Sequence, residues 1–320
     1  MNRDHIEKIR NYVSHIQLSL LLQFALICAL VVLGTYVFVD EELETVHISV
    51  ESTSPPLSDP FSDLDLDAEA VCVFDVENNK IIFAKNEKNV YPLASITKIA
   101  TALTAYKIAA TNTPVSITPE SINIDGDNGL LVEEKWKLSD LLDFTLLVSS
   151  NDGAHQIASV AGVLIDKDRA VDSFVDEMNK LASDIGLEKT RFYNPSGLDI
   201  DNNRSGGYGT AEDVAMLMSY AIVHYPELLE GTKFLEATFV SLDNIIHHAT
   251  NTNPSVADIP GLLASKTGYT NQSGGNLVIV FDPFPGKPIV IAVLGSTYDG
   301  RFTDVDKLSK ATMTFIRQEN

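Results

Sequence analysis

Residues 262–294 read LLASKTGYTNQSGGNLVIVFDPFPGKPIVIAVL, and this stretch gives the clearest indication of the architecture. It contains three apolar runs, 262–268, 276–281 and 288–294, which alternate with short segments rich in glycine and proline. Apolar runs of this length with turn residues between them are typical of consecutive strands. We therefore expect an antiparallel meander of three strands near the end of the chain.

A second group of strands is predicted near residue 70. The runs 70–75 and 80–84 are apolar, and Glu77-Asn78-Asn79 between them has the composition of a tight turn, so they predict a β-hairpin. The sequence between the hairpin and the meander has helical periodicity. Helices are expected from Ser95, from a cap at Ser139, over about 168–185, from the capping box Thr210-Ala211-Glu212-Asp213 and over Thr303–Arg317. This order predicts an α+β fold, an antiparallel sheet flanked by helices, in which the hairpin joins the meander.

An uncharged apolar run, residues 18–39, lies close to the N-terminus. As a helix it would span about 33 Å, enough to cross a hydrocarbon core of about 30 Å. A cleaved signal peptide is the alternative, but its apolar region is normally about 7–15 residues long. Arg3, Lys8 and Arg10 precede the run. The positive-inside rule therefore predicts a cytoplasmic tail over 1–17, a single transmembrane anchor over 18–39, and a remainder outside the cytoplasm, secreted if the segment is cleaved.

Charge separates the next segment from the rest of the chain. Residues 40–67 are rich in Asp and Glu and contain no Lys or Arg, which predicts a disordered linker before a catalytic domain over 68–320. The formal net charge of −21 argues against nucleic acid as a partner, because phosphate binding needs clustered cations. No Cys or His spacing indicates a zinc site, and the adjacent His247-His248 would rarely face one ligand. We expect neither a metal nor a cofactor.

Three short motifs follow one another in the predicted domain: Ser95-Ile96-Thr97-Lys98, Ser149-Ser150-Asn151 and Lys266-Thr267-Gly268. Each motif alone is a weak signal, and Ser-x-Asn occurs a second time at Ser121-Ile122-Asn123. The copy at 149–151 is preferred because it ends a strongly apolar helix, which can place it in the interior. Together the motifs supply a nucleophile, its base, a polar relay and a cation for an anionic substrate, which suffices for acyl transfer through a serine ester.

With these motifs in this order, the chain resembles the D-alanyl-D-alanine carboxypeptidase branch of the low-molecular-mass penicillin-binding proteins. The resemblance covers about residues 68–318 and rests on the segments 93–98, 146–152, Asn194-Pro195-Ser196-Gly197-Leu198 and 265–270. It implies the β-lactamase/transpeptidase-like fold, in which a mostly helical subdomain accompanies the sheet. Class A β-lactamases carry Glu-x-x-Leu-Asn where this chain has Glu188-Lys189-Thr190-Arg191, so we expect no fast hydrolysis of β-lactams.

The same resemblance implies the catalytic roles. Ser95 would attack the substrate carbonyl, Lys98 would take its proton, and Ser149 would pass a proton to the leaving amine. An ordinary lysine has a pKa of about 10.4, so it is protonated at neutral pH and cannot act as a base. Burial and a neighbouring cation both lower the pKa of a lysine, and Lys266 is the expected cation.

The resemblance also implies the residues that bind the substrate. Asn151 would hold the substrate amide, and the backbone N–H of Tyr269 would join that of the nucleophile in an oxyanion hole. Lys266 and Thr267 would face the terminal carboxylate of the substrate. Arg301 resembles the family arginine that binds the same carboxylate, but the sequence is equally compatible with a surface arginine that caps the last helix.

The expected activity is removal of the terminal D-alanine from peptidoglycan stem peptides that end in D-Ala-D-Ala, through a Ser95 acyl-enzyme, with β-lactams as covalent inhibitors. A D,D-endopeptidase or transpeptidase acting on cross-linked peptidoglycan would use the same residues. A non-catalytic β-lactam or peptidoglycan sensor is a further alternative, but it would need an output module for which residues 1–17 leave little room. A structural wall-binding protein would not need the complete set of motifs.

Overall fold

The computed structural model describes residues 23, 25–30, 59–126 and 129–319. The chain divides into two units, residues 1–56 and 57–320. In the first unit residues 25–30 are helical, whereas the predicted tail, most of the predicted anchor and much of the predicted linker lie outside the described residues. Among the residues that are described, no helix combines the length and the hydropathy that crossing a membrane requires.

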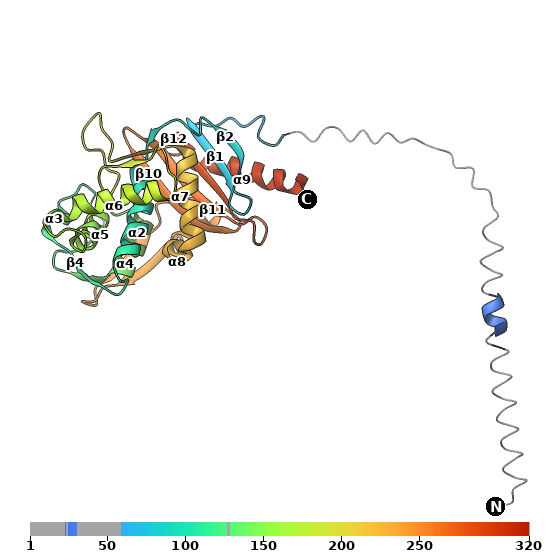
Figure 1. Cartoon of the computed structure of the whole chain (residues 1–320), viewed down its shortest axis with the longest axis horizontal. Helices are drawn as coiled ribbons and strands as arrows, with labels where there is room; N and C mark the ends of the chain where they lie inside the picture. The colour runs from blue at the N-terminus through green and yellow to red at the C-terminus, as the bar shows by residue number, and fades with distance from the viewer. Residues whose placement is uncertain (1–22, 24, 31–58, 127–128, 320) are drawn as a thin grey trace, which may run out of the picture. The chain divides into compact units, whose positions relative to one another are not determined.

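A five-stranded antiparallel sheet runs through the second unit in the order β10-β11-β12-β1-β2 (Figure 1). Its strands are β1 (Ala70–Asp75), β2 (Lys80–Lys85), β10 (Leu262–Thr270), β11 (Gly274–Phe281) and β12 (Ile289–Ser296). The predicted meander and hairpin are confirmed. They join because β1 pairs with β12, so that Cys72 lies opposite Ala292.

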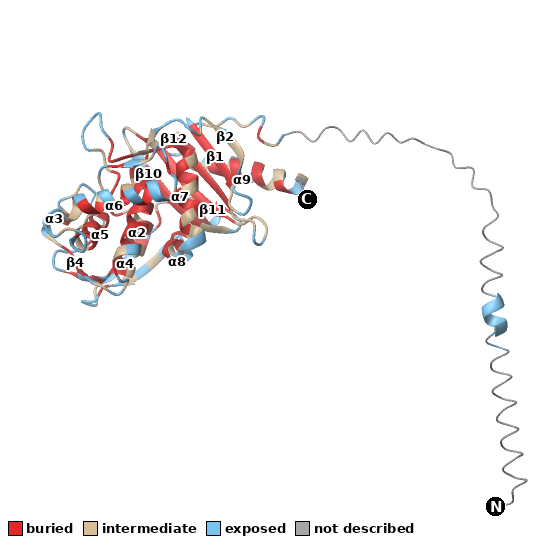
Figure 2. Ribbon diagram, in the orientation of Figure 1, coloured by how far each residue is buried: buried red, intermediate tan, exposed pale blue. Residues whose placement is uncertain are grey.

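The central strands β1, β11 and β12 are buried on both faces, which is why they are apolar at nearly every position, whereas the edge strand β2 is only partly buried (Figure 2). Ala292 on β12 belongs to the hydrophobic cluster that contains helix α7 (Ala211–His224). Its neighbour Val293 points to the opposite face and belongs to the cluster that contains helix α9 (Gly300–Glu319). Neighbouring side chains of a strand thus pack against two different helical layers.

Helices α2, α4, α5 and α6 pack against one another and form the mostly helical subdomain (Figure 1). The helices outside the sheet's two covering layers are α2 (Thr97–Ile108), α3 (Pro119–Ile122), α4 (Leu138–Val148), α5 (Asn151–Val163), α6 (Ala170–Asp184) and α8 (Pro226–Leu229), with the 3-10 turns η1 (Ala94–Ile96), η2 (Glu230–Lys233) and η3 (Pro254–Ala257). Short strands complete the fold: β3 (Tyr91–Pro92), β4 (Pro114–Ser116), β5 (Lys135–Lys137), β6 (Arg191–Phe192), β7 (Gly207–Gly209), β8 (Glu236–Val240) and β9 (Ile246–Thr250).

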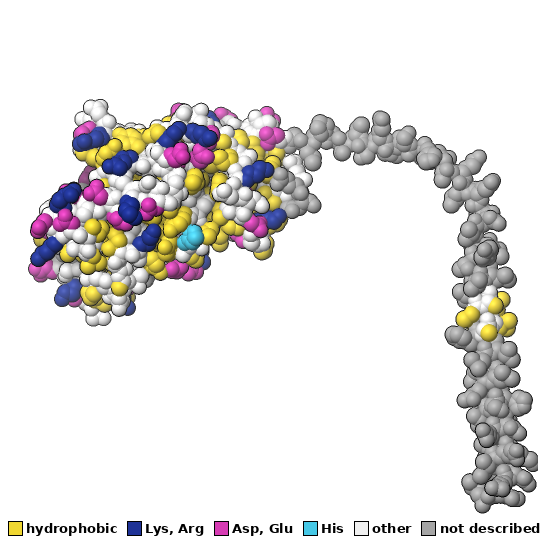
Figure 3. Space-filling view, viewed as in Figure 1, with side chains coloured by type: hydrophobic (Ala, Val, Ile, Leu, Met, Phe, Trp, Pro, Cys, Tyr) yellow, Lys and Arg dark blue, Asp and Glu magenta, His cyan; other side chains and the backbone are white. Residues whose placement is uncertain are grey.

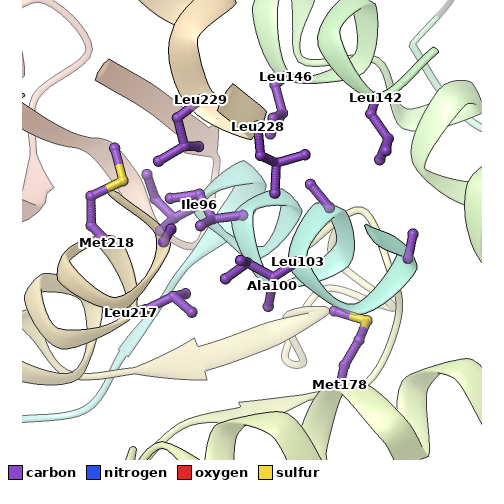
Figure 4. Packing of buried hydrophobic residues seen from close by; sticks show 14 of the residues in the cluster. Ile96, Ala100, Leu103, Leu142, Leu146, Met178, Leu217, Met218, Leu228 and Leu229 are labelled. Atoms are coloured by element: carbon purple, nitrogen blue, oxygen red, sulfur yellow. The ribbon is translucent and has the colours of Figure 1, made fainter. Parts of the chain in front are cut away.

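Helix α2 is the centre of the core. Its residues Thr97 to Ala105 are all buried, and Figure 4 shows Ile96, Ala100 and Leu103 surrounded by side chains from α4, α6, α7 and α8. A helix buried on every side has little freedom to shift, because protein interiors are packed nearly as densely as crystals. The motif at its N-terminus is therefore held on a rigid element.

Two predicted helix starts have different outcomes. The capping box at Thr210 is confirmed, since its side chain accepts a hydrogen bond from the Asp213 N–H. The predicted cap at Ser139 is wrong, because α4 continues directly from β5 and Lys137 is its N-cap residue. The Ser139 hydroxyl instead bonds the carboxylate of Asp140.

The folded unit begins before the predicted boundary at residue 68. Phe61 is buried and stacks on Phe83 with ring centroids 4.8 Å apart. The Asp304 carboxylate accepts hydrogen bonds from the Asp67 and Ala68 N–H groups and so fixes the entry into β1. The acidic composition of this stretch gives no indication that Phe61 is buried against Phe83.

Candidate active site

Ser95 lies in the 3-10 turn η1, which leads directly into α2. The preceding residue, Ala94, has a φ of 47°, a left-handed conformation that persists in a non-glycine residue only where the surroundings enforce it. Two glycines come close enough to do so. A Cβ on Gly197 would lie 1.8 Å from the Ala94 carbonyl oxygen, and a Cβ on Gly268 would lie 3.2 Å from the Ser95 nitrogen. The serine is thus held between a loop and strand β10.

Lys98 follows Ser95 by one turn and is 1% exposed. Its Nζ lies 2.7 Å from Ser95 Oγ, 2.7 Å from Asn151 Oδ1 and 2.8 Å from the Ser196 carbonyl oxygen. A neutral amine has two N–H groups and one lone pair. Since Asn151 Oδ1 and the Ser196 carbonyl can only accept, they take the two N–H groups. The lone pair is then directed at the proton of the Ser95 hydroxyl.

The electrostatic environment favours this neutral form. Burial lowers the pKa of Lys98 well below its usual value, and the nearby cation of Lys266 lowers it further, against the opposing effect of Asp152. Burial also lowers the pKa of Lys266 to about 7, and the Arg301 guanidinium contributes to that shift. The surroundings thus favour the neutral form of Lys98, while Lys266 can gain or lose its proton near pH 7.

The corner between α4 and α5 supplies the second motif. Ser149 ends α4 in a left-handed conformation with a φ of 63°, and its Oγ accepts a hydrogen bond from Lys266 Nζ at 2.8 Å. Ser150 caps α5 by accepting from the Gly153 N–H. Asn151 begins α5, and its Nδ2 donates to the Asp125 carbonyl oxygen at 2.7 Å, which fixes the orientation of its amide.

The second copy of Ser-x-Asn lies elsewhere. The Ser121 hydroxyl is in helix α3, where it donates to Gln156 Oε1 at 2.8 Å and contacts His155 Nδ1 at 3.2 Å. It therefore joins α3 to α5 and does not contact either lysine of the site. The preference for residues 149–151 agrees with this arrangement.

Strand β10 brings the third motif to the sheet edge. The Thr267 hydroxyl lies 2.6 Å from that of Thr252, and Lys266 Nζ also donates to the Thr267 carbonyl oxygen. Arg301 donates from Nη1 to the Gly268 carbonyl oxygen at 2.8 Å. Arg301 is only 3% exposed, so it is not a surface residue, and its Nε has no hydrogen-bond partner among the described residues. A buried guanidinium with a donor to spare is suited to bind an anion.

Tyr269 follows the third motif on β10, and its side chain is 47% exposed. Beside it, a Cβ on Gly268 would lie 2.8 Å from the Leu93 carbonyl oxygen and 3.2 Å from the Ser95 nitrogen, so β10 passes close to the backbone of the nucleophile. The pairing of the Ser95 and Tyr269 N–H groups in an oxyanion hole stays a prediction.

Asn276 is a residue of this site that sequence reasoning missed. It is fully buried on β11, and its Nδ2 donates to the carbonyl oxygens of Pro92 and Leu93, just before the nucleophile. Its Oδ1 accepts from the Gly295 N–H on the next strand. The only sequence signal is an amide at the start of the apolar run 277–281.

The adjacent histidines considered as a metal site separate in the structure. His247 Nε2 lies 2.7 Å from the buried Glu134 carboxylate, whereas His248 Nδ1 contacts the Thr238 hydroxyl. Neighbouring side chains on a strand point to opposite faces, so the two rings have different surroundings.

A serine hydroxyl aimed at a buried amine, with cations beyond it, defines the class of serine enzymes that form an acyl ester without a histidine. Comparison with protein families narrows this class. The model of the Peptidase_S11 family, D-alanyl-D-alanine carboxypeptidase, matches residues 52–297. The chain belongs to this family of serine peptidases.

The relatives include proteins named D-alanyl-D-alanine endopeptidase and proteins named D-alanyl-D-alanine carboxypeptidase. The chain is 28% identical over 217 residues to a D-alanyl-D-alanine endopeptidase of Haemophilus influenzae, which covers 67% of this chain and 70% of the relative. It is 28% identical over 207 residues to the D-alanyl-D-alanine carboxypeptidase DacB2 of Mycobacterium tuberculosis, covering 64% and 67%. The crystal structure of penicillin-binding protein D2 from Listeria monocytogenes in its ampicillin-bound form is 27% identical, covers 79% and 99%, and superimposes with a TM-score of 0.64.

Proposed function

We propose that this family member is a serine-type D-Ala-D-Ala carboxypeptidase that shortens peptidoglycan stem peptides by one D-alanine. The observation that carries the proposal is the 2.7 Å contact between Lys98 Nζ and Ser95 Oγ, in surroundings that lower the pKa of the amine well below its usual value. A serine hydroxyl is a weak nucleophile and becomes effective when an adjacent base takes its proton.

Acylation follows from these positions. Ser95 Oγ bonds to the carbonyl carbon of the penultimate D-alanine while Lys98 takes the hydroxyl proton. The backbone N–H groups of Ser95 and Tyr269 stabilise the oxyanion, a contribution of about 3 kcal/mol per donor in other acyl-transfer enzymes. The C–N bond then breaks, and the leaving amine receives a proton through the Ser149 hydroxyl, which Lys266 orients.

The cations of the site select a substrate that ends in a carboxylate. Lys266 and Thr267 lie on β10, and Arg301 reaches the same strand from α9, where its Nη1 donates to the Gly268 carbonyl oxygen. Its Nε, which has no hydrogen-bond partner among the described residues, supports a role in binding an anion. The carboxylate of the terminal D-alanine fits these groups, and Asn151 then holds the amide on the other side. Water hydrolyses the ester with Lys98 again as the base, which releases the shortened peptide.

Endopeptidase activity on cross-linked stems is the second candidate. It is favoured by the relative from Haemophilus influenzae that is named a D-alanyl-D-alanine endopeptidase. The acylated half of the substrate is the same in both reactions, and only the leaving amine differs. The chemistry above therefore applies to both, and the space on the leaving side decides between them.

β-lactams are the expected inhibitors. The related penicillin-binding protein D2 has been solved in an ampicillin-bound form. A β-lactam that opened on Ser95 would leave an ester like the natural one. Class A β-lactamases use the Glu-x-x-Leu-Asn motif to position the water that hydrolyses the ester. Since Glu188-Lys189-Thr190-Arg191 does not match this motif, we infer that the ester on Ser95 is long-lived.

We also propose that residues 18–39 anchor the chain in the cytoplasmic membrane, with the catalytic domain outside. The uncharged run and the preceding Arg3, Lys8 and Arg10 support this topology. The proposed substrate lies outside the cytoplasmic membrane, in the compartment that this topology gives to the domain.

The test is a paired measurement on the full-length protein and its Ser95→Ala variant. We expect the wild type to release D-alanine from a D-Ala-D-Ala pentapeptide and to become labelled by fluorescent penicillin, and the variant to do neither. Labelling of the variant would show that another residue is the nucleophile. Absence of both activities from a folded wild type would exclude the proposed function.

A further inference from the structure

The Arg301 guanidinium is enclosed by aromatic rings. Its Cζ lies 4.5 Å from the ring centroid of Tyr298, 4.7 Å from that of Phe302 and 6.0 Å from that of Tyr269. These distances are within the range of cation–π contacts. The rings explain how an arginine at the start of α9 is only 3% exposed.

Tyr269 and Tyr298 themselves project into solvent, and together they are called the aromatic rim below. They are 47% and 55% exposed, although large apolar rings usually gain from burial. Their centroids are 4.9 Å apart at an interplanar angle of 88°, an edge-to-face pair. The rim therefore stands as one two-ring surface beside Arg301.

Both residues of the rim are attached to rigid elements. Tyr269 lies on β10, where Arg301 donates to the neighbouring Gly268 carbonyl oxygen at 2.8 Å. Tyr298 lies in the turn between β12 and α9. In that turn the Thr297 hydroxyl accepts from the Gly300 N–H and donates to the Asp67 carboxylate. The backbone segments that carry the rim are thus held by hydrogen bonds on both sides, and the two rings contact each other and the Arg301 guanidinium.

We propose that the aromatic rim is the specificity-determining wall on the leaving-group side, and that it restricts the enzyme to a small leaving amine. This inference rests on the proposed function and decides between its two candidates. When the leaving residue is a single D-alanine, its carboxylate binds at Thr267 and Arg301 and the substrate extends no further. The leaving amine of a cross-linked stem carries further peptide, which meets the Tyr298 ring.

The expected size of the effect follows from the nature of the wall. A single extra methylene in an apolar pocket changes kcat/KM by about 10- to 200-fold, and a peptide that meets the Tyr298 ring adds more than one methylene. Because Tyr298 is more than half exposed, its removal leaves the core intact and should not prevent folding. The ring, and not its hydroxyl, forms the wall, so Tyr298→Phe is the matched control for Tyr298→Ala.

The experiment measures kcat/KM of the full-length wild type, Tyr298→Ala and Tyr298→Phe on two substrates, a D-Ala-D-Ala pentapeptide and a cross-linked muropeptide dimer. The readout is the ratio of dimer to pentapeptide cleavage together with kcat/KM on the dimer itself. A general loss of stability leaves the ratio unchanged. Weaker carboxylate binding, to which the contact of Tyr298 with Arg301 could contribute, lowers pentapeptide cleavage without raising dimer cleavage, so the inference requires that kcat/KM on the dimer rises. We expect Tyr298→Ala to raise this ratio at least about tenfold and Tyr298→Phe to leave it as in the wild type.

An unchanged ratio in Tyr298→Ala would overturn the inference, and so would a lower one, since the rim would then be a platform that binds the larger leaving group. Efficient dimer cleavage by the wild type would overturn it as well. A wild type that cleaves neither substrate would instead count against the proposed function. The circular dichroism spectrum of each variant verifies that it is folded.

Discussion

Replacing Gly268 by alanine should displace the nucleophile without removing any catalytic group. The new Cβ would lie 2.8 Å from the Leu93 carbonyl oxygen and 3.2 Å from the Ser95 nitrogen. Ordinary contacts at such a Cβ begin at 3.4 Å, so one of the two backbones has to move by about 0.6 Å. Leu93 is tied to Asn276, and Ala94 is already in a left-handed conformation, so neither backbone can yield freely.

The magnitude follows from the sensitivity of acyl transfer to geometry. A misplacement of about 1 Å can reduce the rate about 100-fold, so a shift of about 0.6 Å should reduce it roughly tenfold or more. The accompanying loss of stability should be about 1–3 kcal/mol, as for other overpacked sites. We expect Gly268→Ala to be folded but slowly acylated.

The assay is the second-order rate of acylation by fluorescent penicillin, measured together with the free energy of unfolding in urea. Gly231→Ala is the matched control, because a Cβ at Gly231 would meet only Asp143 Cβ at 4.0 Å. Acylation of Gly268→Ala within twofold of the wild-type rate would refute the claim that this glycine holds β10 against the nucleophile.

Three other perturbations have defined outcomes. Protonated Lys266 attracts the carboxylate of the substrate, and the pKa of Lys266 is about 7. The kcat/KM of the wild type should therefore fall as the pH rises through about 7. Arg301→Leu removes a neighbouring cation and so raises the pKa of Lys266. The pH at which kcat/KM declines should then be higher than in the wild type, while kcat/KM itself falls. A decline at the same pH would contradict the effect of Arg301 on the pKa of Lys266. Asn276→Ala removes a donor from the carbonyl oxygens of Pro92 and Leu93, of which Leu93 keeps the Ile96 N–H, and should lower the free energy of unfolding by about 1–3 kcal/mol and slow acylation; if neither changes, Asn276 does not hold the segment before Ser95. His247→Leu removes one of the two partners of the buried Glu134 carboxylate, which keeps the Leu131 N–H, and should cost about 1–3 kcal/mol of stability in a urea titration, whereas a change below about 0.5 kcal/mol would show that the contact contributes little.

The sheet was predictable because its central strands β1, β11 and β12 are buried on both faces. Such strands are continuous apolar runs, and glycine and proline mark the turns between them, as at 282–288. The hairpin and meander could be joined from their order alone. The start of α4 was not predictable in the same way, since β5 passes into the helix without a side-chain cap and Ser139 only looks like one.

Helix α5 was overlooked although its sequence carries a signal. Ser150 caps it, and Ala154, Ile157, Ala158 and Ala161 recur at helical spacing behind the cap. From the sequence, residues 149–151 are predicted only as the end of the preceding helix. Two helices that meet at a left-handed residue look like one helix followed by a loop, because the conformation of Ser149 has no marker in the sequence.

In the candidate site, the residues of the motifs could be found from the sequence, but their supports could not. The partners of Lys98 include a carbonyl oxygen, that of Ser196, and the amide of Asn151 is fixed by the carbonyl oxygen of Asp125. Every residue type has a carbonyl group, so no composition or spacing indicates such contacts. The aromatic cover of Arg301 likewise depends on how two distant segments meet.

The protonation state of Lys98 is the quantity on which this account of the chemistry depends. It can be followed directly in protein labelled with ¹⁵N at the lysine Nζ, by recording the chemical shift of the Lys98 resonance as a function of pH, with Lys98→Arg for assignment. The account predicts a titration midpoint well below the value of 10.5 for an unperturbed lysine. A midpoint at or above that value would mean that the amine is charged when the substrate binds and cannot take the proton of Ser95.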